Sequence, residues 1–188
     1  SNTDPQTDDE ELHQCLKEAC AEGSESVVKI MIENWKVDPN IGMTSKKLGI
    51  TPLAIAAQNG HLNVCKLLIR CGAKLTSKGA QGKTPVHHAA SGSSEVLKFM
   101  LDHAKAPIRI QDKNRQNLLH HAVRAGNLKS IQVLQHCASK DTMQWMVESK
   151  DRWSRAALHW AVLNGHIECA RYLFCLLYTS DAADETCR

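Results

Sequence analysis

Residues 51–73 read TPLAIAAQNGHLNVCKLLIRCGA, and this stretch decides the fold because related stretches recur along the chain. The others are TPVHHAASGSSEVLKFMLDHA from residue 84, NLLHHAVRAGNLKSIQVLQHCA from residue 117 and AALHWAVLNGHIECARYLF from residue 156. A fifth stretch, QCLKEACAEGSESVVKIMIEN, fits the same frame from residue 14. The last four starts are separated by 33, 33 and 39 residues, so the chain is an array of about five related units.

Each unit carries two helical patterns separated by a turn. In the unit from residue 51, Leu53, Ala56 and Ala57 follow the i, i+3, i+4 spacing of one apolar helix face. A glycine at position 60 then allows a tight turn with positive φ. A second apolar pattern, again at helical spacing, completes the unit. The sequence therefore predicts helix–turn–helix units.

The starts of the first helices differ in their capping residues. Thr51–Pro52 and Thr84–Pro85 place a capping threonine before a proline at the first helical position. Asn117–Leu118 and Ala156–Ala157 replace this pair in the last two units. We expect weaker caps and softer local stability in those two units.

With four such stretches in register, the sequence resembles the ankyrin-repeat superfamily, whose period is about 33 residues and whose signature is T-P-L-H-x-A. The resemblance covers residues 12–174. It implies an all-α solenoid of stacked helix–turn–helix units with hairpin loops, containing about five repeats. The last repeat is expected to be truncated, because its second helix pattern stops at Phe174 and the natural protein is expected to continue beyond it. A helix pair cannot bury its apolar face alone, so neighbouring units must stack.

The two ends differ from the repeats in composition. Residues 1–11 contain five carboxylates and no Lys or Arg, which predicts a disordered acidic tail. Residues 175–185, CLLYTSDAADE, resemble a translated sequencing adapter, so residues 175–188 are expected to be an artefact; a genuine polar C-terminal tail is the alternative. Without these ends, 22 basic and 12 acidic residues remain, and the repeat region carries a net charge of +10.

Composition excludes several classes of protein. The chain has 188 residues, of which 43% are hydrophobic and 23% charged, a profile that excludes collagen-like and disulfide-knot proteins. Apolar runs are all shorter than the roughly 20 residues that span a bilayer, so we expect no membrane partner. Eight cysteines without a CxxC pair predict free thiols and an intracellular location, cytoplasmic or nuclear. We also expect a monomer.

The sequence offers no catalytic centre, cofactor site or metal site. G-x-S-x-G, Walker and HExxH motifs are missing, so we expect this segment not to be an enzyme. His87, His120 and His159 occupy the signature histidine column, and the resemblance implies that they hydrogen-bond within the hairpin network. His88 and His121 are one repeat apart, which is too far for both to bind one zinc ion directly.

The resemblance also indicates which positions face a partner. In ankyrin-like folds, the hairpin tips and the exposed positions of the first helices line a concave, protein-binding face. Of the twenty positions that correspond here, six are basic and none is acidic. We name these six the basic stripe: Lys47, Lys83, Lys113, Arg124, Arg152 and Arg155. The alternative is an ordinary solvated, charged face that keeps a repeat protein soluble.

Tryptophans supply candidate anchors beside the basic stripe. Trp153 lies at the rim of its unit, and Trp160 lies on the same first helix pattern, where it could equally pack on the adjoining repeat. The six extra residues within 138–151 bring in Trp145 among methionines and valine. This insertion is either an added turn packed on the neighbouring repeat or an exposed anchor for a partner.

The favoured function is a non-catalytic protein–protein interaction module whose basic concave face binds an acidic or phosphorylated protein segment. One alternative is a substrate-targeting arm of a larger enzyme, such as a ubiquitin ligase or kinase. The other is nucleic-acid binding, which the net charge of +10 suggests but the few aromatic residues disfavour.

Overall fold

The protein is described by a computed structural model that covers residues 5–40 and 49–178. Its helices within these ranges are α1 (Pro5–Glu22), α2 (Glu25–Glu33), α3 (Pro52–Asn59), α4 (Leu62–Arg70), α5 (Pro85–Gly92), α6 (Ser94–Asp102), α7 (Leu118–Arg124), α8 (Leu128–Cys137), α9 (Lys140–Glu148), α10 (Ala157–Leu163) and α11 (Ile167–Tyr178), with a 3-10 turn at Ala80–Gly82. Regular strands do not occur in these ranges; Gln111 and Asn117 form an isolated β-bridge.

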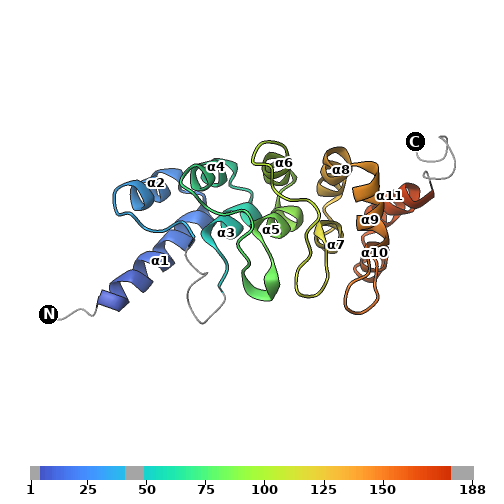
Figure 1. Ribbon diagram of the computed structural model, residues 1–188, viewed down its shortest axis with the longest axis horizontal. Coiled ribbons are helices and arrows are strands. Elements are labelled where there is room, and N and C mark those ends of the chain that lie inside the picture. Colours follow the sequence, from blue (N-terminus) through green and yellow to red (C-terminus); the bar gives the residue numbers. More distant parts are fainter. Residues whose placement is uncertain (1–4, 41–48, 179–188) are drawn as a thin grey trace.

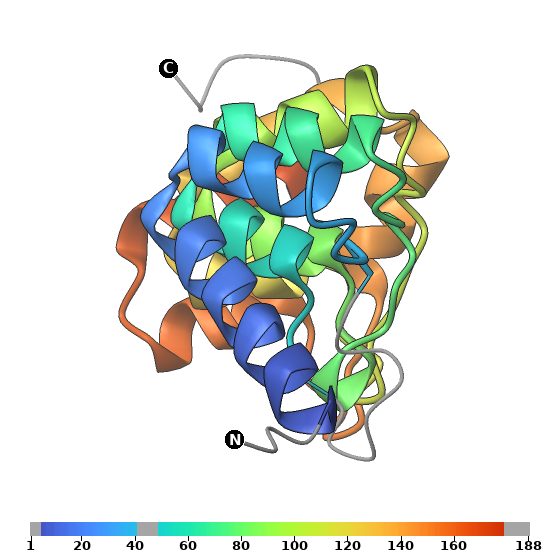
Figure 2. The ribbon, with the colours of Figure 1, turned by 90° about the vertical axis from the view of Figure 1, so that its left-hand side faces the viewer.

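The helices form two parallel rows (Figure 1). One row holds the first helix of each unit, α1, α3, α5, α7 and α10, and the other holds the second helices, α2, α4, α6, α8 and α11. The view from the N-terminal end places these rows one above the other, with the loops between units gathered along one side (Figure 2). This arrangement confirms the predicted all-α solenoid of about five helix pairs.

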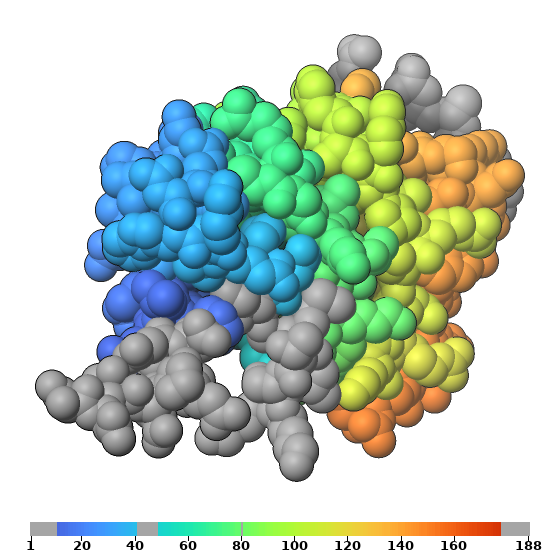
Figure 3. Space-filling view, turned by 60° about the vertical axis from the view of Figure 1, so that its left-hand side comes forward, coloured from blue at the N-terminus to red at the C-terminus, as the bar shows by residue number. Residues whose placement is uncertain are grey.

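The core runs continuously through the stack because each first helix packs on the next. Leu53, Val86 and Leu119 occupy the same position in successive units, and each is at most 1% exposed. The space-filling view shows the units as successive bands along the molecule (Figure 3). Burial of the repeating apolar face therefore joins the units into one body.

The caps differ from the expectation in one unit. Thr51 Oγ1 accepts a hydrogen bond from the amide of Ala54 at 3.2 Å, as predicted. Asn117 Oδ1 accepts from the amide of His120 at 3.1 Å, so the expected weakening at this unit is wrong: asparagine is as good a cap as threonine. Ala156 lacks a side-chain oxygen, and α10 begins without a side-chain cap.

Helical structure extends further toward both ends than the sequence indicated. Residues 5–11, predicted as part of a disordered tail, belong to α1, because a helix anchored by buried residues such as Leu16 propagates at little further cost. Pro5 also suits the first helical position. At the other end, α11 continues to Tyr178, four residues beyond the expected boundary at Phe174. The remainder of both predicted ends lies outside the described residues.

The insertion within 138–151 forms a helix, α9, between the fourth and fifth units. Ser139 Oγ accepts from the amide of Thr142 at 3.3 Å and caps it. Met143, Met146 and Val147 are buried, and α9 contacts α7, α10 and α11. The packed interpretation of the insertion is therefore correct for these three side chains.

Candidate protein-interaction surface

Three hairpin tips closed by the same backbone hydrogen bond lie between the helix pairs, at residues 79–83, 112–116 and 151–155. In each tip the amide of the first residue donates to the carbonyl of the fifth, at 2.8, 3.0 and 2.9 Å. The fourth residue has positive φ in every tip: Gly82 (73°), Arg115 (58°) and Ser154 (60°). Every one of these turns holds a non-glycine residue in the left-handed region, since Gln81 in the first tip also has a φ of 59°, and such residues require support from the surrounding structure.

Neighbouring tips are tied to one another through the backbone. The amide of Lys113 donates to the carbonyl of Gln81 at 2.8 Å, and the amide of Arg152 donates to the carbonyl of Asn114 at 2.9 Å. Lys113 and Arg152 are each the second residue of their tip. The tips therefore form a continuous ridge, and the basic side chains are spaced along it.

A buried carboxylate organises the second tip. Asp112 accepts hydrogen bonds from the amides of Asn114 (2.8 Å) and Gln116 (2.9 Å) and from Nε2 of His121 (3.2 Å). Burial opposes ionisation of Asp112, but the hydrogen bonds from His121 and Gln116 outweigh it and lower the pKa of the carboxyl group. Asp112 is therefore a buried anion that stabilises the turn.

Asp151 has the same role in the third tip and reaches further. Its oxygens accept from the amides of Trp153 (2.9 Å) and Arg155 (3.0 Å), from the indole of Trp160 (3.0 Å) and from Nε2 of Gln116 (3.3 Å). Burial opposes its ionisation, but the donors of Arg155, Trp153 and Trp160 outweigh it and lower its pKa. Through Gln116, Asp151 links the fourth and fifth units.

Three arginines and two tryptophans lie over one another beside Asp151. Going along the cluster, the guanidinium carbon lies 4.6 Å from the ring centre for Arg124 on Trp160, 4.1 Å for Arg155 on Trp160, 4.7 Å for Arg155 on Trp153 and 5.3 Å for Arg152 on Trp153. We name this alternating row the Arg–Trp stack. Each contact is within cation–π range, so aromatic rings separate three positive charges that would otherwise repel.

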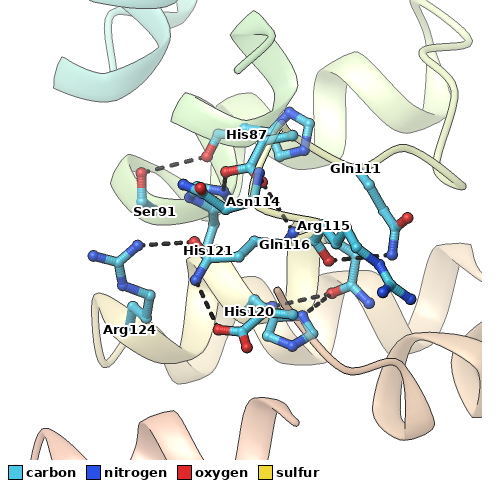
Figure 4. A network of polar contacts seen from close by, with 12 residues as sticks. His87, Ser91, Gln111, Asn114, Arg115, Gln116, His120, His121 and Arg124 are labelled. Atoms are coloured by element: carbon cyan, nitrogen blue, oxygen red, sulfur yellow. Dashed lines mark hydrogen bonds and ion pairs between the residues drawn. The ribbon is translucent and has the colours of Figure 1, made fainter. Parts of the chain in front are cut away.

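Each arginine of the stack is also held by a polar side chain. The contacts are Arg124 Nη1 to Gln116 Oε1 (2.9 Å), Arg152 Nη1 to Asn114 Oδ1 (3.4 Å) and Arg155 Nε to Asp151 Oδ2 (3.6 Å). Figure 4 shows Arg124 pointing toward Gln116, beside His121. The stack is thus preorganised from both sides of the junction between the fourth and fifth units.

Histidines fill the space beneath the ridge without charge. The rings of His87 and His121 meet edge to face at 5.0 Å between centroids. Burial, reinforced by His121, lowers the pKa of His87 to about 3, and burial together with the charge of Lys83 lowers that of His88 to about 4. Burial also lowers the pKa of His121, so these imidazoles are neutral at physiological pH and leave the positive charge to Lys and Arg.

The signature histidines form hydrogen bonds within the hairpin network, as the resemblance implied. His87 Nδ1 accepts from the amide of Thr84 at 3.1 Å. The ring nitrogens of His120 lie 2.8 Å from Asn117 Oδ1 and 3.2 Å from a backbone carbonyl in the third tip. His159, in the last unit, makes the corresponding contact at 3.2 Å but is exposed.

The structure brings together most of the residues predicted to bind a partner. Five of them form the Arg–Trp stack, and Lys83 and Lys113 lie on the two adjacent tips. Trp145 is separate: it is half-buried on α9 and pairs with Arg109, whose guanidinium carbon lies 5.1 Å from its ring centre. Lys47 belongs to residues 41–48, which lie outside the described residues.

Asp112 and Asp151 organise the second and third hairpin tips beside the basic stripe, and the sequence did not lead us to predict them. The set of twenty positions contains no acidic residue, but Asp112 and Asp151 lie directly beside its members, 6% and 2% exposed, and one member of the set, Gln116, is itself buried. An alignment of DKNRQN (112–117) with DRWSRA (151–156) contains the signal, since both begin with aspartate at the first tip position. These carboxylates reduce the charge of the surface without presenting an anion to a partner.

Other features bear on the type of site. Within residues 5–40 and 49–178, no three His, Cys, Asp or Glu side chains converge in a way that could hold a metal ion. In the same ranges, no helix combines the length and apolar character needed to cross a bilayer. Six cysteines in these ranges are free thiols: Cys15, Cys20, Cys65, Cys71, Cys137 and Cys169.

Comparison with known proteins agrees with this architecture. A family model for three copies of the ankyrin repeat matches residues 12–112, 53–144 and 104–184. A transient receptor potential cation channel of Drosophila melanogaster, subfamily A member 1, is 25% identical over 152 residues, or 79% of this chain. A palmitoyltransferase of Debaryomyces hansenii is 30% identical over 176 residues, or 88% of this chain.

The relatives differ greatly in length. The matched region spans 13% of the cation channel and 21% of the palmitoyltransferase. Human cyclin-dependent kinase inhibitor 2A is 27% identical over 121 residues, which are 64% of this chain and 74% of the inhibitor. The residues matched by the ankyrin family model contain the helix pairs from α2 to α10 and the three hairpin tips. The chain belongs to the ankyrin-repeat family.

Proposed function

We propose that this chain is a non-catalytic module that binds an acidic or phosphorylated segment of a partner protein along the basic stripe. Ankyrin repeats are generally protein-interaction modules. The observation that supports the finer proposal is the arrangement of charge: the five described members of the stripe lie on adjoining tips and on α7, whereas the two nearby carboxylates are buried. A partner approaching this ridge meets these cations and neither of the two buried carboxylates, which favours an acidic surface.

The relatives support a protein partner in a similar way. The human relative is, by its name, an inhibitor of a cyclin-dependent kinase, and therefore acts on a protein. We propose that the present chain also acts by binding a protein, without proposing that this protein is a cyclin-dependent kinase. The free thiols fit a reducing, intracellular compartment, and we propose that the module acts there as a monomer.

Binding of an acidic peptide tests this proposal. The probe is a labelled peptide of alternating Glu and Ser, and the variant changes Lys83, Lys113, Arg124 and Arg152 to Gln. The matched control removes the same number of charges from the second helices, by changing Lys29, Arg70, Lys98 and Lys129 to Gln; all four are exposed. We expect a loss of affinity of at least about tenfold in the stripe variant, which corresponds to about 1.4 kcal/mol.

Two outcomes of this experiment contradict the proposal. Equal losses in both variants would mean that only net charge attracts the peptide. Unchanged binding in the stripe variant would exclude this surface altogether. A duplex DNA of mixed sequence, added as a competitor, addresses nucleic-acid binding: displacement of the peptide at equal phosphate and carboxylate concentration would favour that alternative instead.

The similarity to the palmitoyltransferase favours a second candidate, in which the module is the targeting arm of a larger enzyme. That similarity covers 88% of this chain but only 21% of the enzyme. In this candidate, a catalytic domain lies in another part of a longer protein, and the basic stripe binds the substrate protein. A full-length transcript that encodes a catalytic domain in frame with the repeats would support it, and one that encodes repeats alone would exclude it.

A further inference from the structure

Within the basic stripe, the Arg–Trp stack is built differently from the lysine positions. Lys83 and Lys113 are single side chains on their tips. In contrast, Arg124, Arg152 and Arg155 lie over indole rings and are each fixed by a polar neighbour. Ordering three long side chains costs conformational entropy, and here the folded protein has already ordered them before any ligand arrives.

The stack keeps hydrogen-bond donors available at its edges. A guanidinium group carries five N–H donors in its own plane, so a face placed on an indole leaves that plane open. In the described part of the chain, the polar contacts of the stack use one nitrogen from each arginine. Arg124 and Arg152 are exposed, the side chain of Arg155 is 30% exposed, and Trp153 is 51% exposed. Donors of the stack are therefore accessible to the oxygens of a ligand.

The charge of the stack is unbalanced. Three guanidinium groups face one carboxylate, Asp151, whose side chain is fully buried and engaged by four donors within 3.3 Å. The stack therefore has an excess of two positive charges at the surface. A phosphorylated side chain brings about 1.5 to 2 negative charges and three acceptor oxygens, whereas Asp or Glu brings one charge and two oxygens.

We infer that the Arg–Trp stack is a recognition site for a phosphorylated side chain of the partner segment. This inference rests on the proposed function, which requires only an acidic segment, and adds that one phosphate group is bound at the junction of the fourth and fifth units. Arg124 comes from the fourth unit and Arg152 and Arg155 from the fifth, so both units supply positive charge to the site. The lysines of the stripe contribute general attraction along the rest of the segment.

The probe for this site is a Gly–Ser peptide with one central phosphoserine. Two matched peptides carry Ser or Glu at that position. We expect the phosphoserine peptide to bind at least tenfold more tightly than the Ser peptide and several-fold more tightly than the Glu peptide. Affinity should fall on acidification from pH 7 to pH 5, because the second pKa of the phosphate is about 6.

Three variants separate the stack from simple charge. R124Q/R152Q and K83Q/K113Q each remove two positive charges, yet only the first pair touches the stack, and we expect a tenfold loss for it against less than threefold for the lysines. W153L leaves the net charge unchanged and removes the ring shared by Arg152 and Arg155. We expect several-fold weaker phosphopeptide binding in W153L, which attraction by charge alone would not produce. Trp153 and Trp160 should also be the indoles whose N–H signals shift in NMR titrations.

The outcomes distinguish this inference from the proposed function. Equal affinity for the Glu and phosphoserine peptides, or equal losses in the two double variants, overturns the phosphate site while the basic stripe remains a binding surface. Failure of the Glu–Ser peptide to bind, together with phosphopeptide binding that depends on Trp153, excludes an unphosphorylated acidic segment as the partner and keeps the phosphorylated segment and the phosphate site. Absence of binding by every peptide overturns both.

Discussion

Asp151→Asn is the substitution that tests the architecture of the third tip most directly. The asparagine has the shape of the aspartate and keeps one acceptor oxygen, which can still serve the amides of Trp153 and Arg155. Its NH2 group, however, faces the indole N–H of Trp160 and the amide of Gln116, which are donors at 3.0 and 3.3 Å from the present carboxylate oxygen. The NH2 group of the asparagine would then face two other N–H donors without an acceptor between them, and the guanidinium group of Arg155 would lose the negative charge of Asp151 beside it.

The expected cost follows from these contacts. A buried donor left without an acceptor costs about 1–3 kcal/mol, and a hydrogen bond to a charged group contributes about 1.5–3 kcal/mol. The indole of Trp160 loses such a bond and Arg155 an ion pair, so we expect Asp151→Asn to lower the free energy of unfolding by about 3 kcal/mol. With a urea m value of about 2 kcal/mol/M, the midpoint falls by about 1.5 M.

Urea titration at pH 7, followed by tryptophan fluorescence, measures this shift. The control is Asp141→Asn at an exposed position in the first turn of α9, where a few tenths of a kcal/mol are expected from the helix dipole. A midpoint for Asp151→Asn within about 0.3 M of the parent protein would refute the assignment of Asp151 as the centre of the junction.

Acid provides an independent check on the same residue. The pKa of Asp151 is lower in the folded state than its ordinary value of 3.8. Its stabilising effect is therefore complete above the unfolded-state pKa and is lost as the pH falls through the folded-state pKa. The difference in stability between the parent protein and Asp151→Asn should shrink as the pH is lowered below 4. A constant difference would show that the cost is steric and not electrostatic.

Three further substitutions or conditions give distinct outcomes. Gly92→Ala should destabilise the protein by roughly 2–3 kcal/mol in urea, since the added Cβ would lie 2.1 Å from the carbonyl oxygen of Gln58; a neutral result would mean that α3 and α5 separate freely. Ala156→Thr should stabilise it by about 1 kcal/mol by supplying the missing cap of α10, and no gain would show that His159 already satisfies this end. Acidification from pH 7 to pH 5 should lower the urea midpoint, because burial holds the pKa of His87 near 3 while the same histidine in the unfolded chain takes up a proton below about pH 6.5. The free energy of unfolding should fall by up to about 1.4 kcal/mol per pH unit for one such histidine. An unchanged midpoint would contradict the burial of a neutral His87.

Sequence periodicity was sufficient to predict the stack of helix pairs. Leu53, Val86 and Leu119 recur at the repeat spacing, and burial of that column follows directly from the need of each pair for a neighbour. The threonine cap at Thr51 was likewise readable, because it depends on residues within one turn of helix. Features with local causes are the ones that the sequence specifies clearly.

The polar centre of the site could not be read in the same way. Asp151 acts through the positive φ at Ser154, which brings its oxygens to two amides, and through Gln116, which comes from another unit. A carboxylate in a polar loop is usually exposed, so its burial depends on how two units meet. The start of α9 has a local cause, the Ser139 cap, but the added residues before the fifth unit were interpreted only as a turn or an anchor, so this helix boundary was missed although it was readable.

The position of the Arg–Trp stack across a junction has a consequence for how the array opens. In a solenoid, each unit is coupled to the rest mainly through its interfaces with its neighbours, so one interface can open while the others stay closed. A ligand bound at the Arg–Trp stack would contact a site built by the fourth and the fifth units together, so its binding energy would add to the coupling at that one interface. Occupancy should therefore slow amide hydrogen exchange in α10 and α11 while leaving α3 and α4 unaffected.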